Sequence, residues 1–226
     1  MLRPESWPSL PIRLEGVLQD RVETRALLPF SSSMLAQRLP LEGYYAHLCA
    51  WQALWVEVEA LVTEEPPAGW TEDMAFVGLL QADCSYLAPL CGEPDAFVMN
   101  AATGVSRQLR SAWQAERVAL VSALYAFMRI LSEAERLDAC AQRAYGLTLT
   151  GRSFWRYQAL GGPARLADLA ERLDSVPPES RAADRIVAAA RAGTDRPGIR
   201  VCPHFYNSPA EVDRDRKSTR LNSSHT

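Results

Sequence analysis

Side chains that commonly carry chemistry are scarce in this chain of 226 residues. Histidine occurs only as His47, His204 and His225, and all of the 24 basic residues except Lys217 are arginine. A Schiff base needs a lysine amine, so the chain before Lys217 cannot form one. Most metal sites and acid–base sites use histidine, so we expect few sites of either kind.

The five cysteines are scattered, and no two of them have the CxxC spacing of a redox or zinc motif. They are Cys49, Cys84, Cys91, Cys140 and Cys202. An odd number of isolated cysteines is typical of reduced thiols, so we expect a cytoplasmic protein in which they pack as small apolar residues. The first residues, MLRPESWPSLP, contain no apolar segment like that of a signal peptide, which favours the same location.

The carboxylates do not form a metal-binding pattern. Glu57 and Glu59 are two residues apart, so they do not share a helix face, and Asp83 and Asp138 are isolated in the sequence. Di-iron sites in helical bundles need several carboxylates and usually more than one histidine on facing helices. We therefore predict no metal site.

The composition is that of a globular protein, with 48% hydrophobic and 23% charged residues and a net charge of −3. Without a strongly basic field, the chain is not expected to bind nucleic acid or an anionic membrane surface. The most apolar stretch, 118–131, contains Ser122 and Arg129 and is shorter than the roughly 18 residues of a membrane span. It is therefore predicted to be a buried helix.

Apolar residues recur with helical spacing through most of the chain, and no segment shows sustained strand alternation. The predicted helices span 12–28, 32–38, 41–64, 71–91, 105–145 with at least one break, 152–160, 164–175 and 179–192. Helix ends are expected at Pro29, Pro66-Pro67, Gly92 and Gly161-Gly162-Pro163, and residues 95–104 are weakly patterned. The fold class is all-α, with one helical domain over 12–192 and an irregular tail over 193–226.

Four stretches carry a resemblance to a known family. They are 14–30, ending in Leu-Leu-Pro-Phe and followed by LAQRLPLEGYY at 35–45; LLQAD at 79–83; ALVSALY at 119–125; and YGLT at 145–148 with segments 154–157 and 165–173. In this order they resemble the bacterial, biliverdin-producing heme oxygenases. The resemblance implies a helical heme-oxygenase-like bundle, heme as the bound tetrapyrrole, and cleavage of heme to biliverdin, iron and CO.

The positions that perform the chemistry in this family are not matched here. The family's first helix carries a histidine that ligates the heme iron, and the matching position holds Val22, which has no donor atom. The family's central helix carries two glycines four residues apart over the heme face, and these positions hold Arg129 and Glu133. Loss of both glycines is expected to remove the helix kink, and the spacing of the two charges allows an ion pair.

The resemblance also indicates which residues could contact a tetrapyrrole. Tyr125, Arg165 and Arg172 lie in segments that match the family's pocket, where such side chains meet heme propionates. His47 is the one histidine in the predicted helical domain. We interpret it as a hydrogen-bonding residue of the core or the helix surface, in preference to an iron ligand. The aromatic residues Phe154, Trp155 and Tyr157 are expected to belong to the core.

The tail has a different character. Residues 198–214 resemble the C-terminal end of class V aminotransferases, but no Schiff-base lysine precedes them, so we expect no PLP. Residues 217–226, KSTRLNSSHT, resemble a translated sequencing adapter and are left out of the fold prediction.

We therefore expect a degenerate member of the family, a pseudoenzyme that binds heme, a bilin or a similar flat ligand without an axial histidine. Two alternatives stay open. One is an active heme oxygenase with an unusual iron ligand. The other is a helical protein-interaction module without a cofactor, for which the Trp-rich segment 41–64 is the first place to look.

Overall fold

The computed structural model describes residues 7–25 and 29–195, with side chains for residues 7–19 and 32–191. These parts of the chain form nine α-helices and one short 3₁₀ helix, and they contain no strand. The helices are α1 (Leu10–Arg25), α2 (Pro29–Leu35), α3 (Leu41–Glu64), η1 (Glu72–Met74), α4 (Val77–Cys91), α5 (Ala96–Ala115), α6 (Ala119–Leu131), α7 (Ala134–Tyr145), α8 (Ser153–Asp174) and α9 (Arg181–Asp195). The all-α prediction is confirmed.

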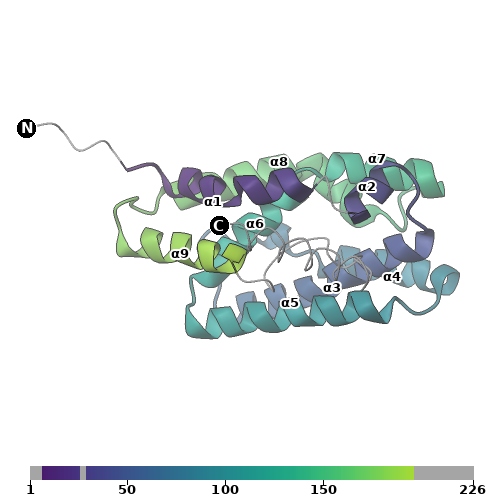
Figure 1. The fold of residues 1–226 in the computed structure, drawn as a ribbon, viewed down its shortest axis with the longest axis horizontal. Helices are drawn as coiled ribbons and strands as arrows, with labels where there is room; N and C mark the ends of the chain where they lie inside the picture. Colours follow the sequence, from purple (N-terminus) through teal and green to yellow (C-terminus); the bar gives the residue numbers. More distant parts are fainter. Residues whose placement is uncertain (1–6, 26–28, 196–226) are drawn as a thin grey trace, which may run out of the picture.

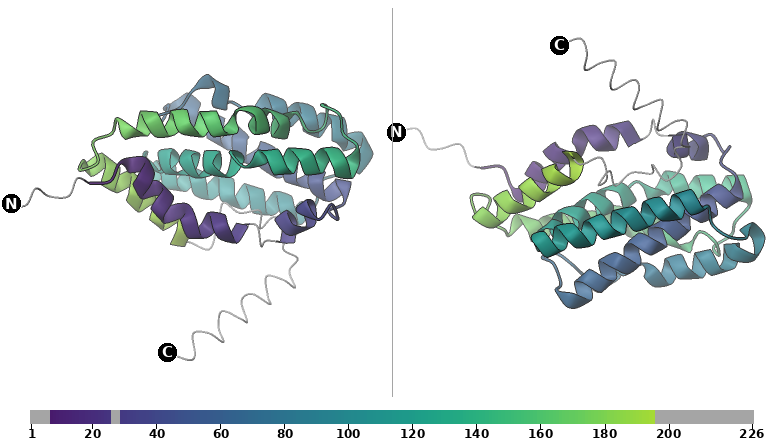
Figure 2. Two further views of the ribbon diagram at one scale, coloured as in Figure 1. Left: turned by 90° about the horizontal axis from the view of Figure 1, so that it is seen from above. Right: turned by 60° about the horizontal axis from the view of Figure 1, so that its bottom comes forward.

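The helices form two layers with α6 between them. Helices α1, α2, α7 and α8 lie along one side of the bundle, and α3, α4 and α5 lie along the other (Figure 1). Helix α9 packs against α1 and α6, and α8 contacts α4, α6 and α7 (Figure 2). Helix α6 therefore has neighbours on most sides, which agrees with the predicted central position of the most apolar segment.

Aromatic side chains fill the space between the layers. Trp55 stacks on Phe76 with ring centroids 4.8 Å apart, and its indole N–H donates to the carbonyl oxygen of Met74 at 2.9 Å. Trp51 of α3 contacts Phe154 and Trp155 at the start of α8, with ring centroids 6.2 Å and 6.3 Å apart. Such pairs add to the stabilisation from burial, so the aromatic residues of α3 and α8 join the two layers.

Several predicted boundaries agree with the structure and others do not. The prediction for 41–64 matches α3, and the break predicted within 105–145 is present. Helix α5 begins at Ala96, so the interpretation of 95–104 as weakly patterned missed a helix. Its first turn is capped by Asp95, whose Oδ1 accepts from the amides of Phe97 at 2.8 Å and Val98 at 3.1 Å.

One predicted helix end is wrong, and another borders residues outside the description. Pro29 is the first residue of α2, a position where proline loses no hydrogen bond, and residues 26–28 before it lie outside the described residues. The run Gly161-Gly162-Pro163 lies inside a continuous α8. At Gly162, α8 passes the end of α6 so closely that a Cβ would lie 3.0 Å from the carbonyl oxygen of Leu131. This glycine allows two helices to approach each other and does not end either of them.

The predictions for the C-terminal part of the chain can be compared with the structure only up to residue 195. Helix α9 continues to Asp195, beyond the predicted end at 192. The predicted tail from residue 196 onward, including 198–214 and 217–226, lies outside the described residues.

One described segment, Glu72–Cys91, is long and apolar enough to cross a membrane by length and composition alone, with a hydropathy of 1.3. The fully buried carboxylate of Asp83 lies within it and is hydrogen-bonded to α8. This segment therefore packs as a helix of the bundle in the structure.

Replacing Gly162 with alanine is expected to lower the free energy of unfolding by about 1–3 kcal/mol, because the new Cβ meets the backbone of α6. The matched control is Gly104→Ala in α5, where a Cβ would have nothing within 4 Å. That substitution should stabilise the protein by roughly 0.4–1 kcal/mol. Urea unfolding of both variants measures the difference, and equal effects would contradict the packing role of Gly162.

Candidate functional site between α1 and α6

Three charged or polar side chains join α1 to α6. The carboxylate of Glu15 on α1 accepts a hydrogen bond of 3.0 Å from the Tyr125 hydroxyl and lies 3.4 Å from Nε of Arg129. Arg129 also pairs with Glu133, with 2.6 Å between Nη1 and Oε1. The ion pair predicted between Arg129 and Glu133 is therefore present, and Glu15 extends it to the neighbouring helix.

This group of residues is only partly exposed, which strengthens its interactions. Tyr125 is 3% exposed and the Arg129 side chain 22%. Burial raises the pKa of Tyr125, and the charge and hydrogen bond of Glu15 raise it further, so the phenol stays protonated. Burial lowers the pKa of Arg129, but Glu133 and Glu15 outweigh this effect and raise it overall.

Val22 lies on the same helix as Glu15. It lies seven residues after Glu15 in the same helix, so the two positions share a helix face. Its side chain lies outside the described side chains. The prediction that Val22 stands at the family's iron-ligating position is therefore not tested by the geometry.

The prediction that loss of two glycines removes the kink after α6 is wrong. Helix α6 ends at Leu131, Glu133 is the N-cap residue of α7, and the chain turns between them. The hydroxyl of Ser132 donates to the carbonyl oxygen of Arg129 at 2.8 Å, and Gly162 of α8 packs against this turn. The chain therefore turns here although Arg129 and Glu133 stand where two glycines were expected to be needed, and the turn lies against α8.

The two arginines of α8 do not join this group. The Arg165 guanidinium lies over the Tyr157 ring at 4.1 Å and donates to the Tyr157 carbonyl oxygen at 2.9 Å and to Gln158 at 3.0 Å. Burial lowers its pKa. Arg172 is exposed in the last turn of α8. Of the predicted pocket residues, the structure brings together Tyr125 and Arg129 and leaves both α8 arginines elsewhere.

His47 is buried in the core. It is 3% exposed, its Nε2 accepts from the Trp51 indole at 3.0 Å, and its ring stacks on Trp155 with centroids 5.8 Å apart. Iron ligation by Nε2 would break this hydrogen bond. The interpretation of His47 as a hydrogen-bonding core residue agrees with the structure.

Other candidate ligands are also engaged in structural contacts. Glu59 accepts from the amides of Phe76 at 2.7 Å and Val77 at 2.9 Å, where α4 begins. Glu57 pairs with Arg110 of α5 at 2.5 Å. Across the described ranges, no group of three or more His, Cys, Asp or Glu residues could hold a metal ion.

The tryptophans of α3 do not form an exposed surface. Trp51 and Trp55 are 6% and 0% exposed, so the interaction-module alternative gains no exposed Trp face from this helix. Exposed apolar side chains include Val56 on α3, Tyr86 and Leu90 on α4, and Leu149 in the loop before α8.

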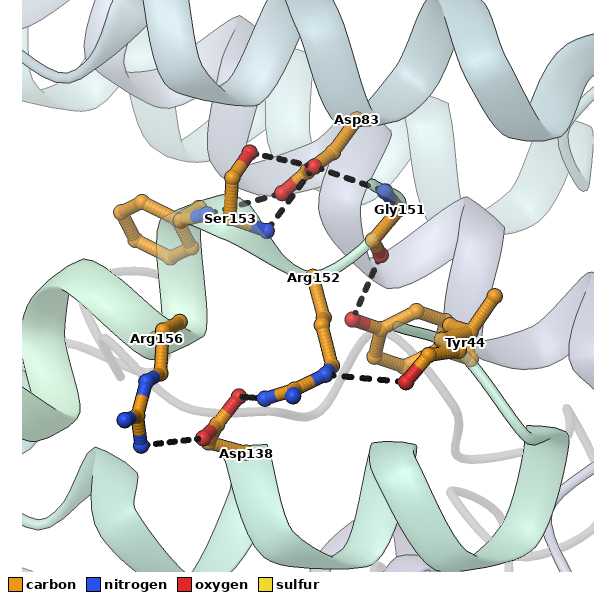
Figure 3. Close-up of polar contacts among 9 residues, drawn as sticks. Tyr44, Asp83, Asp138, Gly151, Arg152, Ser153 and Arg156 are labelled. Atoms are coloured by element: carbon orange, nitrogen blue, oxygen red, sulfur yellow. Dashed lines mark hydrogen bonds and ion pairs between the residues drawn. The ribbon is translucent and has the colours of Figure 1, made fainter. Parts of the chain in front are cut away.

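The start of α8 is held by a carboxylate that sequence reasoning had treated as isolated. Asp83 of α4 accepts from the amides of Gly151 at 3.0 Å, Ser153 at 2.9 Å and Phe154 at 2.8 Å, and from the Ser153 hydroxyl (Figure 3). Burial raises the pKa of Asp83, and these hydrogen bonds offset part of the rise. An aspartate in an otherwise apolar helix needs such partners, and this was the available signal.

Asp138 of α7 holds the same segment from the other side (Figure 3). It forms a buried ion pair with Arg152 and lies 3.7 Å from Arg156. Arg152 also donates to the Leu147 carbonyl oxygen at 3.1 Å, and the Tyr44 hydroxyl donates to Gly151 at 2.9 Å. All of these contacts hold the segment before α8 in place, so we assign this cluster a structural role.

Comparisons with known proteins identify the architecture. The structure is similar to the crystal structure of heme oxygenase-1 from the cyanobacterium Synechocystis sp. PCC6803 in complex with heme, with a TM-score of 0.71. The chain has the heme oxygenase-like fold. The match covers 96% of this chain and 99% of that chain at 15% sequence identity. Neither a protein-family model nor a curated protein matches the sequence.

Within the described residues, a heme bound through an axial histidine does not fit the side chains present. Helix α1 contains no histidine, and Nε2 of the buried His47 accepts from Trp51. The α1–α6 face instead carries two carboxylates, Glu15 and Glu133, around one guanidinium. These groups hold charge and hydrogen bonds and do not replace an imidazole at iron.

Asp83→Asn is expected to lower the free energy of unfolding by about 1–3 kcal/mol, because the amide group would place a donor against an N–H at the start of α8. The matched control is Asp95→Asn, since asparagine caps helices about as well as aspartate and Asp95 uses one oxygen. Urea unfolding of both variants tests this, and similar losses would contradict the special role of Asp83.

Proposed function

We propose that this protein is a heme oxygenase-like domain that binds a flat tetrapyrrole without axial ligation and does not oxidise heme. The observation that carries the proposal is the Glu15–Arg129–Glu133 group on the α1–α6 face, together with Val22 on the same face of α1. In the resemblance to heme oxygenases, Val22 stands at the position of the iron ligand, and Arg129 and Glu133 stand at those of the two glycines.

The chemistry of the face favours an iron-free tetrapyrrole such as a bilin over heme. A bilin presents pyrrole N–H donors where heme presents iron, and donors of this kind need acceptors. Glu15 and Glu133 supply carboxylate acceptors, and Arg129 supplies a cation for a propionate. Heme would gain the same cation but would find no donor to its iron from Val22.

The two alternatives have less support. An active heme oxygenase would need an iron ligand that His47 does not offer while it accepts from Trp51. An interaction module would use the exposed Tyr86 and Leu90 of α4, and nothing in the described residues indicates what would cover them.

The first test is a titration of the full chain with biliverdin and, separately, with ferric heme, followed by visible absorption. We expect a saturable shift of the biliverdin bands and no heme spectrum of an axially ligated iron. Val22→His is expected to add such a spectrum, because it restores an imidazole at the family position. A parent protein that ligates heme and releases CO with a reductant would overturn the proposal, as would a failure to bind biliverdin.

A second test separates Arg129 from the other predicted pocket arginine. Arg129→Gln is expected to weaken biliverdin binding about tenfold, which corresponds to the loss of roughly 1.4 kcal/mol from one charge-assisted hydrogen bond. Arg172→Gln removes an exposed arginine of α8 and should leave the affinity unchanged. Equal effects of the two substitutions on the dissociation constant would show that the α1–α6 face is not the binding site.

A further inference from the structure

Two cysteines from different helices meet in the interior, away from the α1–α6 face. The Sγ atoms of Cys49 on α3 and Cys84 on α4 lie 3.6 Å apart and share a hydrogen bond. Each residue is 7% exposed. The two residues are 35 positions apart in sequence, so their contact is a product of the packing of α3 on α4.

We propose that Cys49 and Cys84 form a reversible disulfide when the protein meets a peroxide, which makes this pair a redox modification site between α3 and α4. A disulfide requires sulfur atoms about 2.05 Å apart, so the pair must close by roughly 1.5 Å through small side-chain rotations. Disulfides formed inside the cytoplasm are usually transient and redox-sensing.

The neighbourhood of the pair distinguishes the two sulfurs. The hydrogen bond with Cys84 lowers the pKa of Cys49. Burial raises this pKa, and a hydrogen bond from the Tyr45 hydroxyl lowers it again. The same bond and burial raise the pKa of Cys84. Cys49 is therefore the thiolate that reacts first, since the thiolate is the nucleophile.

The reaction balances with hydrogen peroxide as the oxidant. The Cys49 thiolate attacks one peroxide oxygen, so an S–O bond forms, the O–O bond breaks, and hydroxide leaves to take up a proton. Cys84 then attacks the Cys49 sulfur, so the S–S bond forms, the S–O bond breaks, and the second water leaves. The two thiols lose two electrons and peroxide gains them.

The location gives the bond a structural consequence. Cys84 directly follows Asp83, whose carboxylate holds the start of α8. Cys49 lies in the same helix as Tyr44, whose hydroxyl donates to the carbonyl oxygen of Gly151 in the same segment. A disulfide would tie α3 to α4 beside both anchors. We therefore expect α3 and α4 to separate less easily in the oxidised protein than in the reduced protein.

The experiment treats the folded full chain with hydrogen peroxide and maps thiols and disulfides by mass spectrometry without reduction. The expected result is a loss of two hydrogens in a Cys49–Cys84 linked peptide, reversed by dithiothreitol, with a melting temperature higher by roughly 4–10 °C in the oxidised form. Cys91→Ser, on the same helix as Cys84, is the control and should keep the linkage.

Two further variants keep the test decisive. Cys84→Ser should abolish the linked peptide and leave Cys49 as a sulfenic or sulfinic acid. Tyr45→Phe should slow oxidation of Cys49 several-fold near neutral pH, because the thiolate loses a hydrogen bond, and it should leave the final linkage unchanged. The proposal is overturned if folded protein oxidises at Cys91 or Cys140 while Cys49 and Cys84 stay reduced, or if the same linkage forms equally well in urea.

Discussion

The buried carboxylate of Asp83 determines where α8 begins, and much of the bundle depends on that point. It gathers three backbone amides at the start of α8, which would otherwise lack acceptors in the interior. From this anchor α8 passes over the end of α6, where Gly162 allows backbone contact with Leu131 and Ser132. The turn after α6 then places Arg129 and Glu133 next to each other at the edge of α1.

The α1–α6 face depends on a few side chains, whereas the fold depends on many. The architecture matches a heme-bound heme oxygenase over nearly the whole chain, whereas the residues on this face are an ion-pair group with a tyrosine. A bundle depends on many dispersed apolar contacts, and a ligation site depends on one donor atom. Likeness of fold therefore does not by itself bring a ligation chemistry with it.

Two other polar contacts of the core have structural roles. Arg152 pairs with Asp138, and His47 accepts from Trp51. A buried ion pair costs desolvation, which good geometry and further hydrogen bonds must offset. The thiol pair of Cys49 and Cys84 differs, because two nucleophilic atoms in contact offer a reaction as well as a packing contact.

The sequence by itself determined the all-α class, the extent of α3 and the central position of α6. These depend on local periodicity and on spacing within one or two helical turns, which the chain carries in any context. Only the tertiary structure decided that Gly162 is a contact and not a helix end, and that Glu15 completes the group at Arg129. Each of these depends on which residue arrives from a distant helix, and single-helix patterns contain no information about that partner.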